Sequence, residues 1–181
     1  MNYLSSGIVD MRQEVLTWND IDLLIDHLVP QFDVIFDVML LVTRGGIIPG
    51  GLVAEALDIE EILTASVDFP AETRNGERQD LQHKFLALPQ FIQFPDASLL
   101  CEKRVLIMDD VWGSGRTISV VKNRVKGAYG IPYTCVLHFN PHRNLFGTEK
   151  PDYYAAITDA YIIYPWEIDL GKSRVLPFNC K

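Results

Sequence analysis

The chain has 181 residues, of which 48% are hydrophobic and 22% charged, enough for one globular domain that needs no metal or disulfide to fold. A formal net charge of -8 excludes the clustered basic surface of a dedicated nucleic-acid binder, so an anionic ligand must be held locally. The three cysteines, Cys101, Cys135 and Cys180, form no CxxC pair, which favours reduced thiols and a cytoplasmic setting. No apolar stretch is long enough to span a bilayer, so we expect no membrane partner.

The first predicted helix covers residues 18–29, with Thr17 as its cap and Pro30 at its end. Its apolar residues recur at helical spacing: Ile21, Leu24, Ile25 and Leu28. Residues 34–43 then form an apolar run without strict alternation, which is typical of a parallel strand covered on both faces. Glycines follow this strand, and Pro49 suits the first turn of a helix that reaches about residue 57.

Further strands are predicted at residues 59–67, 104–108, 133–139 and 160–164, with a turn at 109–116 and a helix at 117–126. Alternating strands and helices predict an α/β fold whose central sheet is mostly parallel. Residues 68–103 lack periodicity and predict a long loop or hairpin, either an active-site lid or a surface insertion. Its aromatic run at 85–94 could instead serve as an interface. Residues 141–181 have short elements that could cap the sheet as a small subdomain.

The segment at residues 104–117 carries the clearest chemistry. Its apolar strand delivers Asp109 and Asp110 to a carboxyl end, where ligands of open α/β sheets bind. Gly113 and Gly115 allow close approach of the backbone, so that free amides at the helix start can hold a phosphate beside nearby hydroxyls. The two carboxylates suit sugar hydroxyls or a hydrated Mg²⁺ ion. The segment therefore predicts that phosphate and sugar are bound together.

This segment resembles the ribose-phosphate signature of type I phosphoribosyltransferases. A second segment, residues 41–50 with Arg44-Gly45-Gly46, resembles the pyrophosphate loop of bacterial xanthine-guanine phosphoribosyltransferases. A third, Tyr164-Pro-Trp-Glu167, is similar to the Pro-Trp-acid segment of the same family, in which the aromatic residue lines the base pocket.

The resemblance implies a type I phosphoribosyltransferase fold with a C-terminal hood, and transfer of a phosphoribosyl group from phosphoribosyl pyrophosphate to a nucleobase, with Mg²⁺ as cofactor. Asp109, Asp110 and Arg44 would be catalytic, and the two aspartates would also hold the metal. The pyrophosphate would contact Arg44, Gly45 and Gly46, and the base Trp166 and Asn140. The 5′-phosphate would lie against Trp112, Gly113, Ser114, Gly115, Arg116 and Thr117. The family also commonly forms homodimers or higher homo-oligomers.

Two positions depart from the 6-oxopurine enzymes of this family. Gly113 stands where those enzymes have an aspartate that faces the base, and Asn140 stands where they have a lysine that recognises the purine oxygen. Adenine-type enzymes have a small residue at the first position, so catalysis is not excluded. The departures leave a purine-type enzyme as the first hypothesis and a non-catalytic regulator that binds phosphoribosyl pyrophosphate or a nucleotide as the alternative.

Overall fold

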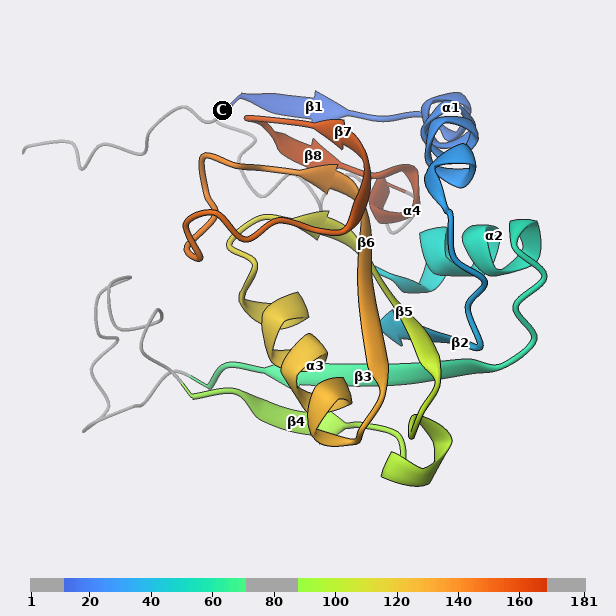
Figure 1. Cartoon of the computed structure of the whole chain (residues 1–181). Helices are drawn as coiled ribbons and strands as arrows, with labels where there is room; N and C mark the ends of the chain where they lie inside the picture. Colours follow the sequence, from blue (N-terminus) through green and yellow to red (C-terminus); the bar gives the residue numbers. More distant parts are fainter. Residues whose placement is uncertain (1–11, 71–87, 169–181) are drawn as a thin grey trace, which may run out of the picture.

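The computed structural model describes residues 12–70 and 88–168 (Figure 1). Its strands are β1 (Gln13–Val15), β2 (Val38–Val42), β3 (Ile62–Asp68), β4 (Gln90–Gln93), β5 (Arg104–Trp112), β6 (Ile131–Phe139), β7 (Tyr153–Ile157) and β8 (Tyr161–Ile163). Its α-helices are α1 (Trp18–Leu28), α2 (Ile47–Ala56), α3 (Arg116–Gly127) and α4 (Pro165–Ile168), and two short 3₁₀ helices lie at Val29–Gln31 and Ala97–Leu99.

Six strands form the central sheet in the order β4-β3-β2-β5-β6-β7. All neighbours pair in parallel except β3 and β4, which are antiparallel. The two remaining strands, β1 and β8, pair in parallel as a separate ribbon. The predicted mostly parallel α/β sheet is confirmed.

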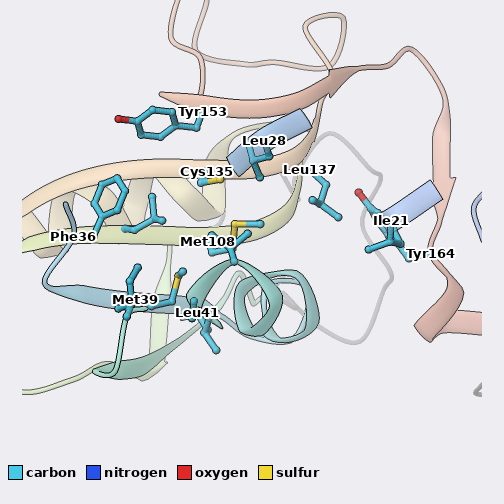
Figure 2. Packing of buried hydrophobic residues seen from close by; sticks show 14 of the residues in the cluster. Ile21, Leu28, Phe36, Met39, Leu41, Met108, Cys135, Leu137, Tyr153 and Tyr164 are labelled. Carbon is cyan, nitrogen blue, oxygen red and sulfur yellow. The ribbon is translucent and has the colours of Figure 1, made fainter. Parts of the chain in front are cut away.

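Helices cover both faces of the sheet, with α1 and α2 on one side and α3 on the other (Figure 1). Alternate residues of each central strand therefore enter different cores. Met39, Met108 and Leu137 pack with residues of α1 and α2. Figure 2 shows these three side chains in the same cluster as Ile21 and Leu28 of α1. Leu40 and Ile107, one position away, pack with residues of α3. This two-sided burial explains why the strands read as continuous apolar runs.

Local sequence sets the start of α1. Thr17 Oγ1 accepts a hydrogen bond from the Asp20 amide at 3.3 Å, and the Asp20 carboxylate accepts one from the Thr17 amide at 2.7 Å. This reciprocal capping box satisfies two amides that a helix start leaves without partners. Ile21 and Leu28 are then completely buried on one face of the helix.

Several predictions about the strands were wrong. The strand expected at 59–67 begins at Ile62. The strand expected at 34–43 begins only at Val38, because Phe36 packs edge-on against other aromatic rings at the end of the sheet instead of pairing. The strand at 104–108 continues to Trp112, so the turn expected at 109–116 begins four residues later. The strand expected at 160–164 is β8, which pairs with β1 and not with the main sheet. Neither β1 nor β7 was predicted.

The segment at residues 68–103 contains part of a hairpin. Val67 of β3 lies opposite Phe91 of β4, and the Phe91 and Phe94 rings lie 5.1 Å apart. Residues 71–87, which include the start of the predicted aromatic run, lie outside the described residues. The lid, the interface and the oligomeric state stay predictions.

Cys101 and Cys135 are free thiols, and Cys180 lies outside the described residues. Over residues 12–70 and 88–168, no helix is long and apolar enough to cross a membrane.

Asp37 fixes the start of the β2–β5 pairing. Its carboxylate accepts hydrogen bonds from the Arg104 amide, Nε and NH2 at 2.8, 2.9 and 2.8 Å, and its own amide donates to the Arg104 carbonyl. The hydrogen bonds from Arg104 lower the pKa of Asp37 to about 2. Since β2 and β5 lead to the two glycine-containing loops, this pair sets the register between them.

We expect Asp37→Asn to lower the free energy of unfolding at pH 7 by about 1 kcal/mol, a modest figure because solvent screens this surface pair. The difference from wild type should persist above the usual carboxylate pKa of 3.8 and disappear as the pH falls towards 2. Chemical denaturation across this range measures it. Asp159→Asn removes an exposed ion pair with Arg12 and should change stability very little; an equal loss in both variants would contradict the assignment.

Candidate phosphoribosyl-binding site

Three neighbouring strands bring the predicted site residues together. In the sheet order, β5 lies between β2 and β6, and all three run in parallel. The loop at Arg44 follows β2, the acid pair lies near the end of β5, and Asn140 follows β6. Carboxyl ends of parallel strands meet at one edge of the sheet, which is where α/β proteins bind ligands.

Asp109 and Asp110 are half-buried neighbours on β5. Asp109 Oδ1 accepts a hydrogen bond from the Asp110 amide at 3.0 Å. Loss of hydration raises the pKa of Asp110 to about 6. The pKa of Asp109 is raised well above its usual value, first by burial and then by repulsion from Asp110. A ligand that brings positive charge or hydroxyl donors to these carboxylates would offset both the loss of hydration and the repulsion between them.

The loop after β2 lies directly against the acid pair. A Cβ atom on Gly45 would lie 2.5 Å from Asp110 Oδ1 and 2.6 Å from Asp109 Oδ1, so any larger residue would have to displace the two carboxylates. The peptide bond between Thr43 and Arg44 is cis. The Gly46 amide donates to the Val42 carbonyl at 2.8 Å, which closes the turn. The Gly46 amide is therefore used within the turn. Gly45 and the exposed Arg44 remain as the candidates for the ligand contacts predicted for this loop.

The loop after β5 ends in a left-handed residue that starts α3. Gly115 has φ of 80° and serves as the helix N-cap. Ser114 and Thr117 are half-buried beside it, and Ser114 Oγ accepts a hydrogen bond from the Arg116 amide at 3.4 Å. The start of a twelve-residue helix presents amides and a positive dipole end, which suits a phosphate group.

Trp112 lies beneath this loop. Its side chain is only 1% exposed and its Nε1 donates to Asn144 Oδ1 at 3.2 Å. The indole therefore supports the loop, and a phosphate contact by Trp112 would be restricted to its main chain. The Leu145 amide also donates to the Ser114 carbonyl at 3.1 Å, so the segment after β6 braces the predicted phosphate loop.

A cavity of about 120 Å³ adjoins the acid pair. Its lining comes from β5, the segment after β6, β8 and α4: Asp110, Val111, Gly113, Asn140, Arg143, Ala160, Tyr161, Ile162, Tyr164 and Glu167. The sequence predicted Asn140 as a base contact and Gly113 as part of the phosphate loop, and both line this cavity. Arg143 and Tyr161 were missed, because an arginine in a loop and a tyrosine on a strand give no signal by themselves.

Trp166 is not among the residues that line this cavity. Its ring stacks on Tyr164, with 4.5 Å between centroids and 6° between planes, and lies 6.0 Å from the Trp18 ring. Tyr164 therefore separates the predicted base-stacking residue from the cavity. Glu167 does line the cavity, and its Oε2 accepts a hydrogen bond from the Tyr164 amide at 2.9 Å.

His138 belongs to the protein interior. Burial lowers its pKa to about 4, and its Nδ1 lies 2.9 Å from the Tyr164 hydroxyl. In the described part of the chain, no group of three or more His, Cys, Asp or Glu side chains converges as a metal cage. Two adjacent carboxylates suit Mg²⁺, which keeps several waters and takes its other ligands from a substrate.

No family model matches the sequence. The chain is 28% identical over 139 residues to the xanthine-guanine phosphoribosyltransferase of Cereibacter sphaeroides, covering 76% of this chain and 72% of that protein. The purine phosphoribosyltransferase structure from Pyrococcus horikoshii is 30% identical, with a TM-score of 0.68 and coverage of 87% and 95%. The xanthine-guanine-hypoxanthine phosphoribosyltransferase of Helicobacter pylori shares the fold, with a TM-score of 0.71 at 15% identity and coverage of 90% and 99%.

The mostly parallel central sheet with its flanking helices is that of the type I phosphoribosyltransferase fold, as the sequence predicted. Within this class, the identity and coverage are sufficient to assign a family: the chain belongs to the purine phosphoribosyltransferases.

We expect Gly45→Ala to destabilise the protein by about 1–3 kcal/mol, because the new methyl group must displace two carboxylates. Gly51→Ala is the matched control: this glycine is in α2 with open space at its Cβ position, and alanine should stabilise the helix by up to about 1 kcal/mol. Urea denaturation of both variants measures the difference. Equal effects would contradict the close approach of Gly45 to the acid pair.

Proposed function

We propose that the protein transfers the phosphoribosyl group of phosphoribosyl pyrophosphate to a purine base and releases pyrophosphate. The single observation that carries this proposal is the contact of the Gly45 backbone with the Asp109 and Asp110 carboxylates. It brings a loop suited to a diphosphate beside a pair of acids suited to a ribose diol. The relatives named above, which include xanthine-guanine enzymes, support the choice of reaction and of purines.

Each part of the substrate has a matching group. The start of α3, from Gly113 to Thr117, would bind the 5′-phosphate through main-chain amides and hydroxyls. Asp109 and Asp110 would accept hydrogen bonds from the ribose hydroxyls. Arg44 and the Gly45 backbone would contact the diphosphate. With both phosphate ends held, the anomeric carbon is fixed between the acid pair and the cavity.

The acid pair also fits Mg²⁺, because this ion is usually held by one or two carboxylates and completes its coordination with water and substrate oxygens. In the described residues, no third His, Cys, Asp or Glu side chain joins the pair in a metal cage. A bound Mg²⁺ would neutralise charge on the diphosphate leaving group. Burial is the first cause of the raised pKa of each carboxylate; repulsion from Asp110 adds to it at Asp109, and repulsion from Glu167 adds to it at Asp110. A cation and sugar hydroxyls would compensate for this cost.

The reaction displaces diphosphate by a ring nitrogen of the base. The bond from the anomeric carbon to the diphosphate oxygen breaks as the bond to the ring nitrogen forms, positive charge develops on the sugar in the transition state, and the proton of that nitrogen passes to water. Carboxylates near the ribose stabilise this charge, while Arg44 stabilises the negative charge of the leaving group. Gly113 cannot take a proton from the base, so this chain does not use the acid that 6-oxopurine enzymes place there.

The cavity next to Asp110 is our proposed base subsite. It is covered by β8 and α4, and together with β1 these elements would form the hood. Asn140 is 2% exposed and its Oδ1 accepts hydrogen bonds from the His142 and Arg143 amides at 3.1 and 3.2 Å. With the carbonyl committed to this turn, the NH₂ group is the part of Asn140 that a base can use. It donates, and so favours a base that presents an acceptor, such as a ring carbonyl oxygen.

Incubating purified protein with Mg²⁺, phosphoribosyl pyrophosphate and a panel of bases tests the reaction directly. We expect pyrophosphate release with at least one purine, and a loss of at least about a hundredfold in Asp110→Asn, because an amide cannot supply the carboxylate's charge. Asp22→Asn, an exposed change on α1, should leave the rate unchanged. Tight binding of phosphoribosyl pyrophosphate without turnover on any base would overturn the proposed transferase activity and favour a non-catalytic regulator.

Asn140→Asp tests the base subsite. The carboxylate can still accept the His142 and Arg143 amides, but it has no NH₂ group to donate. We expect kcat/KM for guanine, xanthine or hypoxanthine to fall about tenfold or more relative to adenine, because a buried acceptor would face the base oxygen. Asn123→Asp on the exposed face of α3 makes the same charge change elsewhere. If the ratio of kcat/KM between these bases and adenine were unchanged in Asn140→Asp, Asn140 would not contact the base.

A further inference from the structure

A buried chain of hydrogen bonds ends on the strand that carries the acid pair. The Tyr164 hydroxyl donates to the Asp110 carbonyl oxygen at 2.9 Å, and His138 Nδ1 lies 2.9 Å from the same hydroxyl. Tyr164 is 1% exposed and His138 4% exposed. The chain therefore connects β6, the segment after β8, and β5 within the interior, where hydrogen bonds are shielded from water.

The direction of these bonds fixes the histidine tautomer. A tyrosine hydroxyl has one proton, and the Asp110 carbonyl can only accept. The hydroxyl proton is therefore used at Asp110, and the Tyr164 oxygen must accept from His138. His138 accordingly has its proton on Nδ1. Each group in the chain has one role: His138 orients Tyr164, and Tyr164 holds the backbone of Asp110.

Asp110 needs such support because its strand loses a neighbour at this point. The pairing of β2 with β5 ends at Leu41 and Met108, where β2 gives way to the loop at Arg44. Beyond Met108, β5 continues to Trp112 with β6 as its paired neighbour. The acid pair thus lies on the half-supported end of the strand, and the Tyr164 hydroxyl adds an attachment there.

Tyr164 also contacts the other half of the proposed active site. Its side chain lines the cavity assigned to the base, its ring stacks on Trp166, and its amide donates to Glu167. It belongs to the core cluster that includes Ile21 and Met108 (Figure 2), so the ring has little freedom to move. One rigid residue therefore joins the wall of the base cavity to the backbone of the acid pair.

We infer that Tyr164 and His138 are positioning residues for the proposed transfer, and that they hold Asp110 where it meets the ribose and the diphosphate. Neither residue needs to touch the substrate's reacting atoms. The inference rests on the proposed function for its substrate, but the hydrogen-bond chain does not depend on which base is used.

Tyr164→Phe removes the hydroxyl and keeps the ring that stacks on Trp166. We expect the KM and the calorimetric Kd for phosphoribosyl pyrophosphate with Mg²⁺ to rise about fivefold, the scale of one lost neutral hydrogen bond. The KM for the base should change little, because the aromatic wall is retained. Tyr153→Phe is the matched control: the Tyr153 residue is 8% exposed, and its hydroxyl donates to Asp33 Oδ1 at 2.8 Å, away from the acid pair.

Substitutions of His138 provide a second, independent test of the inference. His138→Asn places an amide NH₂ where Nδ1 was and should recover most of the affinity that His138→Ala loses, whereas a merely structural role would not depend on that donor. The inference would be overturned if Tyr164→Phe and Tyr153→Phe lost stability equally while the KM and Kd for phosphoribosyl pyrophosphate stayed unchanged. Absence of turnover in the wild type overturns the proposed reaction instead, and the calorimetric comparison then still decides whether Tyr164 positions Asp110. A wild type that does not bind phosphoribosyl pyrophosphate overturns both.

Discussion

Asp109 and Asp110 lie next to each other at the end of a parallel strand, partly removed from water and repelling one another. The arrangement is costly for a folded protein unless something at the strand end compensates for the charge. The rest of the site is arranged around it: Gly45 brings the neighbouring loop within contact distance, and the start of α3 offers amides on the other side. The fold places the loop at Arg44, the acid pair and the start of α3 along one sheet edge, where we propose that they bind the diphosphate, the ribose and the 5′-phosphate.

The residues around the acid pair fall into two groups, those at the proposed ligand site and those that hold the backbone behind it. Some are exposed or half-buried at the strand ends, where we propose that the ligand binds, such as Arg44 and Thr117. Others hold the backbone behind it, such as Trp112 beneath the phosphate loop and Tyr164 against Asp110. The second group is buried, and its hydrogen bonds decide where the first group points. Gly113 and Asn140, the two departures from the family pattern, both line the cavity that we propose as the base subsite.

The sequence predicts the central fold well where physical signals are local. Thr17 and Asp20 form the capping box at the start of α1, and the two-sided burial of β2, β5 and β6 appears as continuous apolar runs. It fails where the signal is distant or ambiguous. The β1–β8 ribbon joins segments about 150 residues apart through strands of three residues, which have no periodicity to detect. An apolar run cannot show that Phe36 packs outside a strand, and a Pro-Trp motif cannot show that Trp166 stacks on Tyr164 instead of lining the cavity.

A crystal structure of the protein with phosphoribosyl pyrophosphate and Mg²⁺ would show whether the acid pair binds the ribose. We expect diphosphate density against Arg44 and Gly45, ribose hydroxyls within hydrogen-bond distance of Asp109 and Asp110, and the 5′-phosphate at the start of α3. A ligand bound elsewhere, or carboxylates turned away from an occupied sugar site, would contradict it.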